Sequence, residues 1–97
     1  MRVVLWTEQA RADLAAIHAF INQDSRHYAS VVITRLIAAT DRLAQFPESG
    51  RAVPEFDNPL VREVVHRPYR IVYRLVGANE VHVLTVHHAS QRFPAEI

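Results

Sequence analysis

The feature that most constrains this chain is a change in the spacing of its apolar residues at Pro59. Before Pro59 they recur every three or four positions, which is typical of amphipathic helices. After Pro59 the spacing falls to two, which is typical of strands. A helical half followed by a stranded half predicts an α+β fold. The chain has 97 residues, and we expect a single domain over residues 1–97.

Two helices are predicted in the first half. Thr7 precedes the first and Ser25 precedes the second, and both are preferred N-cap residues. The first helix carries one apolar stripe, formed by Ala10, Leu14, Ile17 and Ile21. The second, from about Arg26 to Gln45, carries a stripe of Tyr28, Val32, Leu36, Ala39, Leu43 and Phe46, widened by Ile33, Ile37 and Thr40. The connection is short, so the helices should pack as an antiparallel hairpin.

Strands are predicted on both sides of this hairpin. A short β-prone run covers Arg2 to Trp6, and an irregular loop is expected from Ser49 to Pro59. Three further strands are predicted at Val61–His66, Tyr69–Val76 and Glu80–His88. Their tight turns make them an antiparallel meander. The expected fold is therefore β-α-α-β-β-β, with the helical hairpin packed on an antiparallel sheet.

The last two predicted strands are apolar on both faces. In the first of them, one face carries Tyr69, Ile71, Tyr73 and Leu75, and the other carries Arg70, Val72, Arg74 and Val76. In the second, one face carries Val81, Val83, Thr85 and His87, and the other carries His82, Leu84, Val86 and His88. A sheet with one solvated face usually alternates cleanly, and one hairpin covers only one face. The other face therefore predicts a binding surface, unless the tail Ala89–Ile97 folds over it or two copies pair.

The charges suggest what such a partner would offer. The net charge is only +1, so there is no global attraction to nucleic acid. All basic residues are arginines, whose planar fork suits carboxylates and phosphates. The stranded half is rich in them and in histidines, with Arg62, Arg67, Arg70, Arg74, Arg92, His66, His82, His87 and His88. We expect a partner segment with an apolar strip and acidic positions.

The sequence offers few routes to a catalytic centre. His82 and His88 lie about 20 Å apart along an extended strand, so neither a metal nor another cofactor is expected. Two glycines in the whole chain exclude a phosphate-binding loop. Metal-free RNA cleavage remains chemically possible if Arg70 and Arg74 clamp a phosphate while His88 transfers a proton. Absence of cysteine and an apolar start too short for a signal peptide favour a cytoplasmic protein.

Several segments, in order, resemble the ParE/RelE superfamily of bacterial toxins. Trp6–Leu14 is similar to the first-helix motif of that family, and Phe46–Arg51 is similar to its P-x-x-G-R break. The later segments Val61–Glu63, Tyr69–Arg74 and Val86–Ala89 are similar to its R-E, Y-R-I-x-Y and V-x-H segments. The resemblance covers nearly the whole chain and implies the fold expected above.

The resemblance also implies a function and partners. Such toxins are neutralised by an antitoxin whose C-terminal segment wraps the toxin, which would cover the second sheet face. ParE-like members poison DNA gyrase, whereas RelE-like members cut mRNA on the ribosome. The low net charge, the Pro47–Arg51 stretch and the Trp6–Glu8 opening favour the ParE branch. That branch implies growth arrest without catalysis. Neither membrane binding nor direct sequence-specific DNA binding is expected. The oligomeric state is left open between a toxin dimer and a toxin–antitoxin heterotetramer.

The candidate contact residues follow from these expectations. For the target or the antitoxin they are Arg70, Val72, Arg74, Leu84, Val86, His88 and Arg92. The RelE-like alternative, a metal-independent ribonuclease, would use Arg62, Arg70 and His88, which fall on comparable positions of that branch. Ala89 stands where some relatives carry a tyrosine. A third alternative is a protein of the toxin fold that has lost toxicity and acts only as a binding partner.

Overall fold

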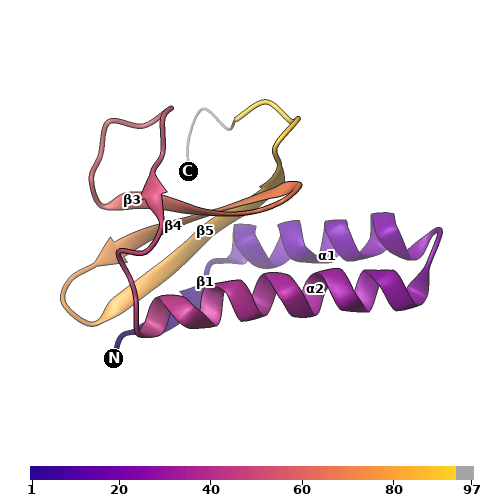
Figure 1. Cartoon of the computed structure of the whole chain (residues 1–97), viewed down its shortest axis with the longest axis horizontal. Coiled ribbons are helices and arrows are strands. Elements are labelled where there is room, and N and C mark those ends of the chain that lie inside the picture. The colour runs from indigo at the N-terminus through magenta and orange to yellow at the C-terminus, as the bar shows by residue number, and fades with distance from the viewer. Residues whose placement is uncertain (94–97) are drawn as a thin grey trace.

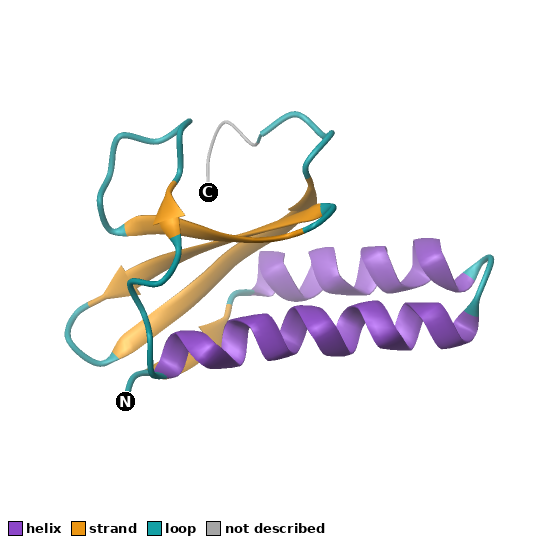
Figure 2. Cartoon of the chain, viewed as in Figure 1, coloured by secondary structure: helices purple, strands orange, loops and turns teal. Residues whose placement is uncertain are grey.

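The computed structural model describes residues 1–93 as two helices packed against a five-stranded sheet (Figure 1). Helix α1 spans Glu8–Asn22, helix α2 spans Arg26–Asp41, and a single 3₁₀ turn, η1, spans Arg42–Ala44. The strands are β1 (Val3–Trp6), β2 (Arg51–Ala52), β3 (Val61–His66), β4 (Tyr69–Val76) and β5 (Glu80–His88). Figure 2 shows both helices on the same side of the strands. The predicted α+β class, element order and helical hairpin are confirmed.

Both predicted helix caps are present. The Thr7 hydroxyl oxygen accepts the N–H of Ala10 at 3.1 Å, and the Ser25 hydroxyl oxygen accepts that of Tyr28 at 3.0 Å. The Thr7 hydroxyl also donates to the carbonyl oxygen of Val83 at 2.9 Å, which fixes the start of α1 to β5. Helix α2 ends at Asp41 instead of near Gln45, because its last turn tightens into η1. The two ends of its predicted stripe, Tyr28 and Phe46, are exposed.

The sheet is mixed, which differs from the antiparallel sheet predicted. Its strand order is β1-β5-β4-β3-β2, and β3, β4 and β5 form the predicted antiparallel meander. Strand β1 instead pairs in parallel with β5, with Val3 opposite Glu80 and Trp6 opposite Val83. Parallel neighbours need a long crossover, and the helical hairpin supplies part of it. Strand β2 lies inside the loop that was predicted to be irregular, with Arg51 opposite Glu63.

A β-bulge in β5 changes which side chains face the helices. Val72 pairs with Thr85 but Tyr73 pairs with Val83, so Leu84 is an extra residue in β5. After an extra residue, each following side chain points to the sheet face opposite to the one that strict alternation predicts. Val86 therefore joins the core beneath the helices together with Val83, whereas Leu84 packs on the opposite face. The prediction that Leu84, Val86 and His88 share one face was wrong, because it assumed strict alternation.

Asp13 of α1 ties the bulge to the helical layer. One carboxylate oxygen accepts the hydroxyl of Thr85 at 2.6 Å and the backbone N–H of Val86 at 3.0 Å. These two donors lie directly after the extra residue Leu84, where the regular ladder is interrupted. The carboxylate thus binds one side-chain hydroxyl and one backbone N–H just beyond the bulge.

Tyr73 fastens the loop after η1 to the sheet. Its buried hydroxyl donates to the carbonyl oxygen of Pro47 at 2.7 Å and accepts the N–H of Gly50 at 3.0 Å. Replacing Tyr73→Phe leaves both backbone groups unpaired, and we expect the free energy of unfolding to fall by about 1–3 kcal/mol. Urea denaturation measures this. Tyr28→Phe, which removes an exposed hydroxyl, should change it by less than about 0.5 kcal/mol; equal effects would contradict the role of Tyr73.

Candidate functional site

The sheet face opposite the helices is covered by the chain itself. Val53 and Phe56, from the loop between β2 and β3, and Phe93, from the tail, pack on this face around Val72. Figure 1 shows that loop and the tail on the side of the sheet away from α1 and α2. The prediction that this face stands open was therefore wrong around Arg70 and Val72, whereas Arg74 of the same face is exposed. The alternative in which the tail folds back holds for residues 89–93, and the rest of the predicted tail, 94–97, lies outside the described residues.

Arg70 lies at the centre of this covered face and is held on three sides. Its Nε donates to Glu63 at 2.6 Å, and its two terminal nitrogens donate to the two carboxylate oxygens of Glu55 at 2.8 Å each. The ring of Phe93 covers the guanidinium, with its centroid 4.7 Å from Cζ. The Arg70 side chain is only 12% exposed. The two carboxylates therefore supply, within the chain, the acidic positions that the sequence suggested a partner would bring.

Glu63 is the buried anchor of this network. Its side chain is 0% exposed, and its second carboxylate oxygen accepts Nε of Arg51 at 2.6 Å. Glu55 is more exposed, but hydrogen bonding to Arg70 holds the pKa of its carboxyl down at about 2. The same hydrogen bonding raises the pKa of Arg70. The Glu55–Arg70 pair therefore stays ionised over the physiological pH range, and the network is a structural element of the fold.

The other predicted contact residues fall on different surfaces. Arg74 and Arg92 are exposed, and Leu84 is half-buried beside Val72. Val86 is only 2% exposed and belongs to the core beneath the helices. The predicted set is therefore divided between the covered face, the helix-side core and the solvent, because of the bulge in β5.

His88, the last of the predicted set, lies at the end of β5 on the helix side of the sheet. Its ring stands edge-on to Tyr69 with centroids 5.7 Å apart, and its Nδ1 accepts the backbone N–H of Ser90 at 3.1 Å. Arg62 lies elsewhere, with one terminal nitrogen donating to the carbonyl oxygen of Gly50 at 3.0 Å. Arg70 is committed on the opposite face. The three residues of the ribonuclease alternative are thus not brought together.

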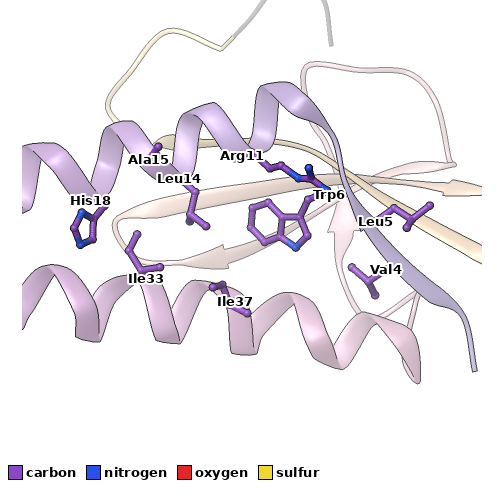
Figure 3. A pocket seen from close by; sticks show the side chains of 9 residues that line it. All are labelled: Val4, Leu5, Trp6, Arg11, Leu14, Ala15, His18, Ile33 and Ile37. Carbon is purple, nitrogen blue, oxygen red and sulfur yellow. The ribbon is translucent and has the colours of Figure 1, made fainter.

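An apolar groove with a volume of about 490 Å³ opens between the two helices beside β1 (Figure 3). Its lining comprises Val4, Leu5, Trp6, Arg11, Leu14, Ala15, His18, Ile33 and Ile37. Figure 3 shows Leu14, Ile33 and Ile37 directed into the space between α1 and α2, with the Trp6 indole at one end. Arg11 and His18 are the basic members of this lining. Of these positions, Leu14, Ile33 and Ile37 were predicted to belong to the apolar stripes of the two helices, and the extra width of the second stripe was the available signal.

The groove continues along an exposed sheet edge. Strand β1 is the terminal strand, and the N–H groups of Val3 and Thr7 bond toward the β5 side, to the carbonyl oxygens of Asn79 and Val83. Along a strand, the N–H and C=O groups of successive residues point alternately to its two sides. The N–H and C=O groups of Val4 and Trp6 therefore point to the open edge of the sheet. Such an edge can accept another strand. The groove and the edge together form a surface suited to an extended apolar segment.

Metal sites and membrane-spanning helices are the other features that would indicate a function. Among residues 1–93, no three His, Asp or Glu side chains gather in a way that could hold a metal ion. In the same part of the chain, neither helix is long and apolar enough to cross a membrane. The groove beside β1 combines an apolar lining with an open strand edge, and it is the candidate site for a partner segment.

Comparison with known proteins gives a consistent set of relatives. Residues 4–93 match a family described as "ParE toxin of type II toxin-antitoxin system, parDE". The chain is 36% identical over 91 residues to Toxin RelE2 of Caulobacter vibrioides, which covers 94% of this chain and 99% of that protein. It is 34% identical over 93 residues to Putative toxin Y4kP of Sinorhizobium fredii, with 94% and 92% covered. Among solved structures, it resembles "Chromosomal ParDE TA system from P. aeruginosa", with a TM-score of 0.74 at 25% identity over 91% of this chain and 96% of that chain.

Proposed function

Because the chain belongs to the ParE toxin family of type II toxin–antitoxin systems, we propose that it inhibits DNA gyrase and that a cognate antitoxin neutralises it. The family match over residues 4–93 is the observation that carries this proposal. The small net charge of +1 supports a protein target. A toxin that acts on the ribosome must bind a dense phosphate surface, for which a strongly basic protein is better suited.

We assign the antitoxin contact to the groove between α1, α2 and β1, because the second sheet face is covered by the chain's own loop and tail. An exposed apolar surface of this kind usually marks a binding site. Extended backbone of the antitoxin would pair with the edge of β1 while its apolar side chains fill the space beside Ile33 and Ile37. Acidic side chains of the same segment would meet Arg11 and His18.

The gyrase part of the proposal predicts inhibition in a purified system. We expect the chain, in stoichiometric excess, to block supercoiling of relaxed plasmid by gyrase, and we expect cleaved plasmid to accumulate. Prior mixing with the antitoxin should restore supercoiling, because a bound toxin is unavailable to gyrase. Relaxation of supercoiled plasmid by topoisomerase I is the control and should be unaffected. Full gyrase activity at excess toxin would contradict the gyrase target.

The alternative is a metal-independent ribonuclease that acts on ribosome-bound mRNA. Its support is the 36% identity to Toxin RelE2. The separation of Arg62, Arg70 and His88 disfavours it. Primer extension on mRNA from cells that express the toxin separates the two functions. Cuts at ribosomal A-site codons would favour the ribonuclease. Unchanged growth, together with active gyrase and intact mRNA, would favour a member of the family that has lost toxicity.

A further inference from the structure

His87 is a buried histidine on the covered sheet face. It is only 7% exposed, and within residues 1–93 neither ring nitrogen has a hydrogen-bonding partner. The ring of Phe93 stands edge-on to it, with centroids 5.2 Å apart. A buried polar group without a partner is unfavourable, and a charged one would be far more so. This arrangement therefore requires His87 to be neutral.

Among residues 1–93, the charged groups around His87 give it no free counter-ion. Arg70 of β4 lies directly opposite it in the strand register, and its positive charge opposes a second one. The carboxylates of Glu63 in β3 and Glu55 in the loop are both bound by Arg70. Asp13 of α1 is occupied by hydrogen bonds from the bulge. Burial, and then the charge of Arg70, lower the pKa of His87.

Phe93 provides the cover over this histidine from a segment that lies outside the sheet. Besides His87 and Arg70, its ring touches that of Phe56 with centroids 5.4 Å apart. The segment that carries it, residues 89–93, follows the end of β5. Its backbone bonds to the rest of the chain lie at the start of the segment, from Ala89 to the carbonyl oxygen of Pro68 at 2.7 Å and from Gln91 to that of His88 at 2.9 Å. Phe93 can therefore lift away while every strand pairing is kept.

We propose that residues 89–93 form a strap that closes over the covered face while His87 is neutral and opens when His87 takes up a proton. Opening brings water to the His87 ring and uncovers the guanidinium of Arg70. The strap is a property of the folded toxin itself and holds whichever target the toxin has. It couples the accessibility of Arg70 to pH.

The direction of the pH effect follows from the two states. An open strap leaves His87 with an ordinary pKa of about 6.5, and the closed strap lowers that pKa. The equilibrium constant for closure is therefore at its maximum above about pH 6.5 and falls as the pH drops below it, by up to about tenfold per pH unit until the pKa of the closed state is reached. The carboxyl of Glu55, with a pKa of about 2, stays ionised through this window. The Glu55–Arg70 ion pair therefore does not contribute to the change.

NMR of the full chain between about pH 7.5 and about pH 5 tests the strap, since histidine titrates in this range. We expect the nuclear Overhauser contact between the Phe93 and His87 rings to weaken as the pH falls. The Phe93 ring shifts and the His87 titration should share one midpoint, below that of an exposed histidine. A Phe93–His87 contact that stays constant while His87 titrates would overturn the proposal.

Two matched variants locate the effect. His87→Leu removes the proton-binding group and keeps an apolar side chain under Phe93, so the Phe93 shifts should become independent of pH. His27→Gln changes an exposed histidine of α2, away from the strap, and should leave the pH dependence as it is. Persistence of the pH dependence in His87→Leu, or its loss in His27→Gln, would overturn the proposal. If His87→Leu does not fold, the test is whether the His87 titration and the Phe93 ring shifts of the unmodified chain share one midpoint; two different midpoints would overturn the proposal.

Discussion

Replacing Arg70→Met is expected to lower the free energy of unfolding by about 3–5 kcal/mol, because it removes one partner of a buried ion pair. The change leaves the fully buried carboxylate of Glu63 with Arg51 alone, whose side chain is 63% exposed. A small domain has only about 5–15 kcal/mol of stability in total. The variant should therefore unfold at a much lower urea concentration than the unmodified protein, measured by far-UV circular dichroism.

Two controls separate lost charge pairing from lost packing. Arg74→Met makes the same chemical change at an exposed position of the same strand, and we expect an effect below about 0.5 kcal/mol. The double variant Arg70→Met with Glu63→Leu removes both buried charges and should recover part of the lost stability. Equal effects of Arg70→Met and Arg74→Met would refute the structural role of Arg70.

Replacing Ile37→Asp is expected to weaken antitoxin binding about 100-fold or more, which corresponds to about 3 kcal/mol. Ile37 lines the groove yet is 40% exposed, so a charge there opposes an apolar partner while the fold tolerates it. Cells that produce this variant with its antitoxin should stop growing, because the toxin keeps its activity and escapes neutralisation. Calorimetric titration of the variant with the antitoxin measures the affinity.

Ala38→Asp is the matched control for the groove. It adds the same charge to the next exposed position of α2, which does not line the groove, and the antitoxin should still bind and restore growth. Unchanged antitoxin affinity of Ile37→Asp would refute the groove as the docking site. That result would leave the gyrase proposal untouched, since the supercoiling assay tests it separately.

The elements that could be predicted are those with local signals. Thr7 and Ser25 carry side chains that cap helices, and the caps formed where the sequence indicated. The turn at Arg67–Pro68 and the spacing of apolar residues predicted β3, β4 and β5 to the residue. The parallel pairing of β1 had no local signal, because it depends on where the chain returns after the whole meander.

The candidate site was harder to predict for a related reason. The bulge at Leu84 moves Val86 and His88 to the helix side, and nothing in the residue types marks the inserted position. The cover over this sheet face comes from Phe56 and Phe93, which lie in segments without periodicity. The sequence did suggest acidic partners for Arg70, but they proved to be Glu55 and Glu63 of the same chain.

The parallel pairing of β1 with β5 also determines when a newly made chain becomes a toxin. Val3 is made well before its partner Glu80, which follows the helices and two strands of the meander. Contacts so distant in sequence form only after the intervening chain is complete. Until β5 is made, the helices have no finished sheet to pack against and the edge strand has no neighbour. A fragment that stops before β5 therefore lacks the strand that pairs with β1 and much of the sheet against which the helices pack.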